Sequence, residues 1–318
     1  MTLSARTRPR SRSLVALGLV LPLAATTACS PGTPDGGVDV LTSFYPLQYV
    51  AEQVGGEHVN VTNLTPAAAD PHSVELSPAR VREMGQADLV VYLSGLQPAT
   101  DEAVAANPPE RVLDTAEAAG LEAGPNGAGA ETSDSGVLDP HFWQDPSRLS
   151  DVAQDVAAEL SDTDPDHAAD YAANAAALVA ELRALDGDYR EALAQCAGAT
   201  LVVSHEAFGY LAERYDLVQV GISGIDPEAE PSPARLRAVR SVVQAHDVQT
   251  IFFEVITSPE VAQALAEDIG IDSAKLDPIE GQADPEADYM DVMRENLAAL
   301  EDGLVCAGSG AGGTDGSR

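Results

Sequence analysis

The sequence predicts an α/β fold made of two βα lobes with mostly parallel sheets, joined by one long rigid helix. In both halves of the chain, short apolar runs of strand length alternate with helical patterns, which indicates βαβ units. The run at residues 88–93 is apolar almost throughout, as expected for a parallel strand covered on both faces. With 318 residues and 45% hydrophobic content, the chain exceeds the usual size of a single domain.

The N-terminal lobe is predicted over residues 38–146. Its first helix follows residues 43–47 and ends at a Gly-Gly pair. A second helix begins at Ser77, with Pro78 in its first position. Strands are expected at residues 38–41, 59–64, 88–93 and 111–113.

Residues 147–196 are predicted to form a helical segment that contains the linking helix. Within residues 166–195, apolar side chains recur at helical spacing and make one stripe. Its members are Tyr171, Leu178, Leu182, Leu185, Tyr189 and Leu193. At about 1.5 Å per residue, a continuous helix here would be roughly 45 Å long, enough to join two lobes rigidly.

The C-terminal lobe is predicted over residues 197–306 and repeats the pattern of the first. His205 is expected to open a helix, and the Ser-Pro-Ala-Arg sequence that begins at Ser77 recurs at Ser232. Strands are expected at residues 200–204, 217–222, 250–254 and 271–276. Residues 307–318 are expected to be a disordered tail.

Residues 1–28 have the pattern of a secretory signal peptide, since four arginines and no acids precede an apolar run. Cys29 ends a partial lipobox, in which Thr26 stands where leucine is usual. We therefore expect a lipid on Cys29 and a flexible tether at residues 29–37. The mature protein is expected outside the cytoplasm, anchored to the bacterial cell membrane.

The chain is strongly acidic, with 51 acidic residues, 17 basic residues and a formal net charge of −34 at pH 7. Nucleic acid and anionic lipid are poor partners for such a surface. A cation is a natural partner, although an acidic, lysine-poor surface also serves solubility alone.

Two cysteines, Cys196 and Cys306, remain once Cys29 is assigned to the lipid. In an exported protein they can form a disulfide. Two buried thiols are the alternative, and the spacing of the cysteines does not decide between them.

The chain contains six histidines. Three are expected to be ordinary surface residues in turns or at helix ends: His58, His167 and His246. The other three lie at the ends of predicted strands or in the loops after them, where open α/β sheets bind ligands: His72, His141 and His205.

His141 lies within residues 139–146, beside the only tryptophan and between two Asp-Pro steps. Each X-Pro step disfavours helical geometry at the preceding aspartate, so we expect a pinned, extended turn. An imidazole on a rigid loop is a good metal ligand, and a half-buried loop histidine is the alternative.

Asp277 follows the last predicted strand and offers a carboxylate at a similar edge. Three imidazoles and one carboxylate can make a closed tetrahedral site, which suits zinc. Manganese would prefer a second carboxylate, which Glu206 beside His205 could offer. Glu254 and Ser204 are candidates for orienting the ligands, although each is more simply explained as a polar group at the end of a strand.

Five motifs occur in order along the chain, at residues 43–47 (SFYPL), 70–72 (DPH), 139–143 (DPHFW), 204–211 (SHEAFGYL) and 230–233 (EPSP). Together they resemble the zinc and manganese solute-binding proteins of bacterial ABC importers, from about residue 38 to residue 304. The resemblance implies one metal in the cleft between two lobes. Its ligands would be His72 and His141 from the N-terminal lobe, and His205 and Asp277 from the C-terminal lobe. Histidine rather than glutamate at position 205 favours zinc.

The resemblance implies a monomeric zinc-binding receptor that delivers the ion to a metal ABC permease and is not an enzyme. One alternative keeps the fold with manganese or iron as cargo. Another is a zinc hydrolase with Glu206 as general base, which needs an open coordination position. Zinc-binding relatives often carry a histidine-rich loop before the second ligand motif, whereas residues 120–136 contain no histidine. The ion is therefore acquired directly or loaded by a separate metallochaperone.

Overall fold

The computed structural model describes residue 2 and residues 37–67, 69–122, 138–254 and 259–306. The described residues from Gly37 onward belong to one compact unit. The predicted signal peptide, Cys29, nearly all of the tether and the tail at 307–318 lie outside the described residues, as does most of the loop at 120–136. Within the described residues, no helix combines the length and the apolar character needed to cross a membrane.

Each half of the chain contains a four-stranded parallel sheet, and the two sheets have the same topology. The N-terminal sheet has the order β2-β1-β3-β4, from β1 (Val38–Thr42), β2 (Val59–Asn63), β3 (Leu89–Tyr92) and β4 (Val112–Asp114). The C-terminal sheet has the order β6-β5-β7-β8, from β5 (Thr200–Val203), β6 (Val218–Gly221), β7 (Thr250–Phe253) and β8 (Asp272–Lys275). Each strand matches a predicted apolar run to within about one residue at either end, so the prediction of two parallel-sheet lobes is confirmed.

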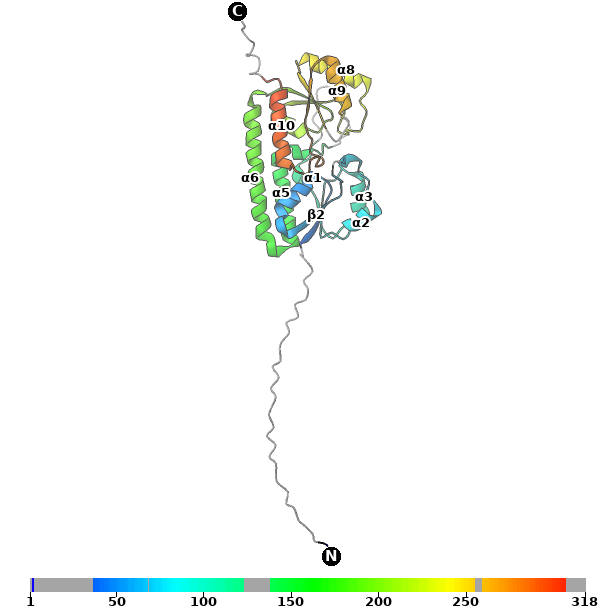
Figure 1. The fold of residues 1–318 in the computed structure, drawn as a ribbon, viewed down its shortest axis with the longest axis vertical. Coiled ribbons are helices and arrows are strands. Elements are labelled where there is room, and N and C mark those ends of the chain that lie inside the picture. The colour runs from blue at the N-terminus through cyan, green and yellow to red at the C-terminus, as the bar shows by residue number, and fades with distance from the viewer. Residues whose placement is uncertain (1, 3–36, 68, 123–137, 255–258, 307–318) are drawn as a thin grey trace, which may run out of the picture. The chain divides into compact units, whose positions relative to one another are not determined.

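The outer face of each sheet is covered by its own pair of helices (Figure 1). In the N-terminal lobe these are α2 (Pro78–Met84) and α3 (Pro98–Ala106), over a small core that includes Leu41 and Val90. In the C-terminal lobe they are α8 (Pro233–Ala245) and α9 (Glu260–Ile269), over a core that includes Val202. The two outer cores are separate from one another.

The inner faces of both sheets pack on one continuous core. The helices that take part are α1 (Tyr45–Gly55), α4 (Ala116–Ala119), α5 (Pro146–Thr163), α6 (Ala168–Ala192), α7 (Gly209–Arg214) and α10 (Tyr289–Gly303). Strand residues of both lobes, such as Val40 and Leu201, belong to this core. The apolar stripe predicted along the linking helix is buried here, and α6 packs against α1, α5 and α10 (Figure 1).

The linking segment is helical throughout 165–195, which confirms the continuous helix predicted over 166–195, and only its first and last turns have 3-10 rather than α geometry. α6 is preceded by a 3-10 turn at Pro165–His167 and followed by another at Leu193–Gln195. Three further 3-10 turns lie at Gly56–His58, Pro71–Ser73 and Phe142–Gln144. The last two contain or follow predicted ligands.

The helix predicted to begin at His205 begins instead at Gly209. The segment between them is held as a loop, because the backbone N–H of Glu206 donates to the carbonyl of Gly224 at 3.0 Å. The side chain of His205 is also bound to Glu254, at the end of β7. His205 therefore projects from a loop at the carboxyl edge of the sheet.

Cys196 and Cys306 form a disulfide, with their Cα atoms 4.2 Å apart and a sequence separation of 110 residues. The bond joins the end of the linking segment to the chain just after α10. Of the two alternatives left open by the sequence, the structure contains the disulfide.

Candidate metal centre

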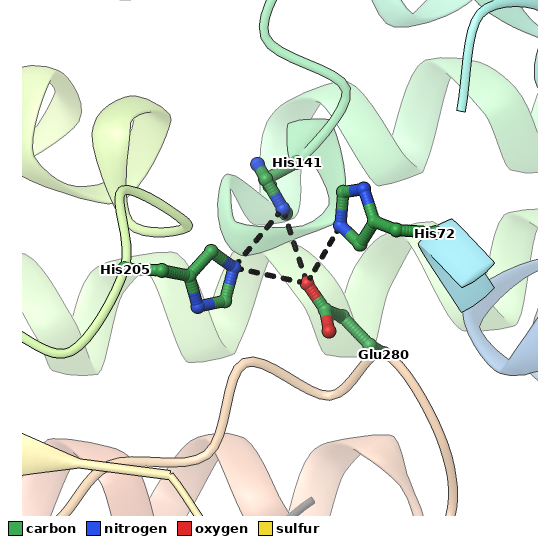
Figure 2. Close-up of side chains that lie close together, drawn as sticks. All are labelled: His72, His141, His205 and Glu280. Carbon is green, nitrogen blue, oxygen red and sulfur yellow. Dashed lines mark hydrogen bonds and ion pairs between the residues drawn. The ribbon is translucent and has the colours of Figure 1, made fainter. Parts of the chain in front are cut away.

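His72 is presented by a 3-10 turn that Asp70 caps. The carboxylate of Asp70 accepts the backbone N–H of His72 at 2.8 Å, and Pro71 occupies the first position of the turn. The imidazole of His72 points toward His141, His205 and Glu280, and these four residues are called the cluster from here on (Figure 2). Within the cluster, His72 Nε2 lies 3.3 Å from Glu280 Oε1.

His141 is fully buried and is held by Asp139 in two ways. Asp139 Oδ1 accepts the backbone N–H of His141 at 2.9 Å and lies 2.7 Å from its Nδ1. Because Nδ1 is engaged by the carboxylate, Nε2 is the nitrogen that faces the cluster, 3.1 Å from Glu280 Oε1.

His205 is buried as well and is oriented by Glu254. Its Nδ1 lies 2.6 Å from Glu254 Oε1, and its Nε2 lies 3.2 Å from Glu280 Oε1. A buried carboxylate bound to Nδ1 fixes the orientation of the ring and makes Nε2 a better metal ligand. The structure thus places Glu254 in the orienting position that the sequence suggested.

Glu280 supplies the carboxylate of the cluster. It projects from the loop after β8 toward the three imidazoles, and its side chain is completely buried (Figure 2). Its Oε1 contacts all three Nε2 atoms, whereas its Oε2 has no hydrogen-bond partner among the described residues. Within the described part of the chain, His72, His141, His205 and Glu280 are the only group of this kind whose ligand atoms all lie within 4.8 Å of one another.

The spacing of these atoms fits a tetrahedral zinc ion. Zinc bonds to nitrogen and oxygen of about 2.0–2.1 Å place the corners of a tetrahedron about 3.3 Å apart. The distances from Glu280 Oε1 to the three Nε2 atoms are 3.1–3.3 Å, and the Nε2 atoms of His141 and His205 are 3.4 Å apart. Four of the six distances between donor atoms therefore match a tetrahedron, and all six lie within 4.8 Å, so the four groups can close a tetrahedral site around an ion.

The electrostatics of the cluster suit a cation. Burial opposes a charge on Glu280, but the charge of His205 and hydrogen bonds with the imidazoles hold the pKa of Glu280 well below its usual value. Burial would likewise lower the pKa of His205, yet Glu254 and Glu280 together raise it to about 10. These shifts favour a proton on His205 beside the buried carboxylates when no metal is bound.

Zinc binding is expected to release protons at pH 7, because His205 carries a proton in the metal-free protein and must lose it to coordinate. Below about pH 10, displacement of this one proton should lower the apparent zinc affinity about tenfold for each unit by which the pH falls. Calorimetric titration in buffers with different ionisation enthalpies measures the number released. A binding heat that does not depend on the buffer would contradict this linkage.

The prediction that Asp277 is the fourth ligand disagrees with the structure. Its Oδ1 accepts the backbone N–H of Ile279 at 2.9 Å, and its Oδ2 lies 3.3 Å from Lys275 Nζ. Asp277 shapes the turn after β8, and the chain reaches the cluster only three residues later, at Glu280. Between them Ile279 has φ of 58°, an unfavourable conformation for a β-branched residue that costs about 1–3 kcal/mol.

A local signal could have corrected this assignment. The chain has seven Asp-Pro steps, and in all of them except that at Asp164 the aspartate Oδ1 accepts the backbone N–H two residues later, at 2.8–2.9 Å. These six aspartates are Asp70, Asp139, Asp145, Asp226, Asp277 and Asp284. The aspartate of such a step is therefore a turn-forming residue. At three of these steps the residue that reaches the cluster lies two or three positions further along, at His72, His141 and Glu280.

Other sequence candidates lie outside the cluster. Glu206 Oε1 is 3.1 Å from the guanidinium of Arg235, and Ser204 Oγ donates to the carbonyl of Phe252 at 3.4 Å. Glu206 is therefore paired with Arg235. It was the residue predicted to serve as a second carboxylate for manganese or as the general base of a hydrolase.

The three histidines expected at the surface also remain apart from the cluster. His58 Nε2 lies 3.2 Å from Asp170, and its ring stacks on that of His167 at a centroid distance of 3.9 Å. His246 ends α8 and is exposed.

Two parallel-sheet lobes with a largely buried donor set of three imidazoles and one carboxylate define a metal-binding protein of the two-lobed solute-binding class. The profile of the family described as "Zinc-uptake complex component A periplasmic" matches residues 40–303. The chain belongs to this family, which is one of binding receptors rather than enzymes.

Relatives and solved structures agree with this assignment. The chain is 32% identical over 309 residues to the high-affinity zinc uptake system protein ZnuA of Bacillus subtilis, covering 92% of this chain and 96% of that protein. It is 33% identical over 302 residues to the zinc-binding lipoprotein AdcA of Streptococcus pneumoniae, of whose length it spans 59%. A Zn(II)-bound mutant variant of AdcAII from Streptococcus pneumoniae superposes with a TM-score of 0.72 at 31% identity, covering 85% of this chain and 99% of that one.

Proposed function

We propose that the protein is a high-affinity extracytoplasmic receptor that binds one Zn(II) and delivers it to an ABC permease for uptake. The observation that carries the proposal is the contact of Glu280 Oε1 with three imidazole Nε2 atoms at 3.1–3.3 Å. That donor set can close a tetrahedron around an ion held between elements of both lobes. Membership of a zinc-uptake family supports the same cargo.

Zinc is favoured over manganese by the chemistry of the donors. The cluster contains three imidazoles and a single carboxylate, whereas manganese prefers sites richer in oxygen. The second carboxylate that the sequence offered, Glu206, is engaged by Arg235.

A zinc hydrolase is disfavoured for two reasons. Catalytic zinc keeps a coordination position open for water, and Glu280 would close that position here. The candidate general base, Glu206, has its carboxylate beside a guanidinium.

The finer features of the proposal concern location and partners. We expect the mature chain to be a monomer held at the cell membrane through a lipid on Cys29, a role consistent with the lipoprotein name of the AdcA relative. The permease would receive the ion directly from this cluster. The ion would reach the cluster either unaided or from a metallochaperone.

Uptake of radioactive zinc by cells that lack the chromosomal copy tests the function. In zinc-limited medium, the wild-type chain should restore uptake, and His205→Ala should leave it at the level of the deletion strain. Asp277→Asn is the matched control, because it keeps the oxygen that accepts the Ile279 N–H and alters a carboxylate outside the cluster. Restoration of manganese uptake instead of zinc uptake would assign the other cargo, and full uptake with His205→Ala would reject the site.

A further inference from the structure

The loop that carries Glu280 is held by two buried donors from the other lobe. Trp143 Nε1 and Gln144 Nε2 both donate to the carbonyl oxygen of Pro278, at 2.7 Å and 2.5 Å. A carbonyl oxygen has two lone pairs, so this pair of bonds uses its full capacity. Trp143 and Gln144 follow His141 directly, and thus one short segment supplies a ligand and two contacts to the loop of another ligand.

Gln144 is an unusual choice of residue unless this bond matters. Its side chain is completely buried, and its Oε1 has no hydrogen-bond partner among the described residues. An unpaired buried amide oxygen is destabilising, and an apolar side chain of similar length would avoid that. What the amide adds is the donation of Nε2 to Pro278.

The loop needs such support, because its backbone is unfavourable on its own. Ile279 sits between Pro278 and Glu280 with φ of 58°, a left-handed conformation that a β-branched residue rarely adopts. A strained conformation of this kind persists only where its surroundings over-determine it. Here the hydrogen bonds to Pro278 lie on one side of Ile279, and the bond from its own N–H to Asp277 completes the turn.

Trp143 is itself fixed from two directions. Its carbonyl accepts the hydroxyl of Tyr289 at 2.6 Å, at the beginning of α10. Its ring packs against Phe44 with a centroid distance of 4.8 Å. A donor anchored in this way can set the position of the loop rather than follow it.

We propose that Trp143 and Gln144 are positioning residues for the metal centre, which act through Pro278 to hold Glu280 against the three imidazoles. The proposal rests on the proposed zinc-binding function. It follows that Glu280 cannot leave the cluster together with its loop unless both hydrogen bonds to Pro278 are broken. Release of the ion to a permease would then require the hydrogen bonds from Trp143 and Gln144 to Pro278 to break.

A double-mutant cycle tests the proposal on the full mature chain, with zinc affinity measured by competition with a chromophoric chelator. Gln144→Met removes the amide and keeps the length of the side chain. We expect it to weaken zinc binding about tenfold or more, the range usual for groups that orient ligands. In a Glu280→Ala background the same substitution should change zinc affinity by less than about twofold, because the group it positions is gone.

Trp143→Phe removes the indole donor and keeps an aromatic ring. If Gln144→Met does not fold, the same double-mutant cycle with Glu280→Ala can be made with Trp143→Phe. Tyr189→Phe is the matched control. It also removes a buried hydrogen bond to a backbone carbonyl, that of Met293, but neither residue belongs to the cluster. It should lower the melting temperature and leave zinc affinity unchanged.

Three results would overturn the proposal. Loss of zinc affinity by the same factor with and without Glu280 would show a general effect on folding, and unchanged affinity in the Gln144 and Trp143 variants would show that the bonds do not position Glu280. A wild-type chain that bound no zinc would reject the zinc function itself, and the positioning role with it.

Discussion

Glu280→Gln is expected to weaken zinc binding by about 100-fold or more, whereas Asp277→Asn should leave zinc affinity nearly unchanged. Loss of a group that merely orients a ligand already costs about 10–100-fold, so loss of the anionic ligand itself should exceed that range. Glu280 Oε1 contacts all three imidazoles, whereas both oxygens of Asp277 are used within its own turn and by Lys275.

The two substitutions form a matched pair, because each replaces a buried carboxylate by its own amide. Both variants should keep the fold, which circular dichroism and thermal melting without metal can check. Chelator competition then reports the zinc affinity of each. If the Asp277 variant lost affinity and the Glu280 variant kept it, the fourth ligand would be Asp277 after all.

Loss of the Cys196–Cys306 disulfide is expected to lower the free energy of unfolding by about 2–5 kcal/mol. The bond closes a loop with a sequence separation of 110 residues, which includes the whole C-terminal sheet. Cross-linking a loop of this size restricts the unfolded chain strongly, so its removal favours unfolding.

Urea unfolding with and without reductant measures this effect, and the Cys196→Ser/Cys306→Ser double variant provides the same comparison without reagent. Zinc affinity should be the same in the oxidised and reduced proteins, because neither cysteine belongs to the cluster. Equal unfolding free energies under the two conditions would mean that the bond contributes nothing to stability.

The arrangement of the fold could be predicted because buried strands and helices have characteristic patterns of apolar residues. Parallel strands covered on both faces read as apolar runs, and β3 and β5 are of this kind. The stripe from Tyr171 to Leu193 fits the helical period, and its residues are buried in the structure.

The histidines could be found for a related reason. His72, His141 and His205 follow strands or lie in loops at the carboxyl edges of parallel sheets, and topology brings such edges together. That these three histidines lie near one another could therefore be predicted from the order of strands and loops alone. The start of α7 was missed because the bonds that hold the preceding loop, from His205 to Glu254 and from Glu206 to Gly224, join segments far apart in sequence.

Glu280 could not be found in this way, because its position depends on a turn rather than on a pattern. The carboxylate nearest to the strand, Asp277, is used to form the turn. Glu280 reaches the cluster only because Ile279 adopts a left-handed conformation and Pro278 is held from the other lobe. Neither property is visible in composition or periodicity.

Anomalous diffraction at the zinc edge, from crystals of the zinc-loaded mature chain, would locate the ion and its ligands. We expect a single zinc peak, about 2.0–2.2 Å from the Nε2 atoms of His72, His141 and His205 and from a carboxylate oxygen of Glu280. A peak bound to Asp277 or Glu206, or the absence of a zinc peak at the cluster, would contradict it.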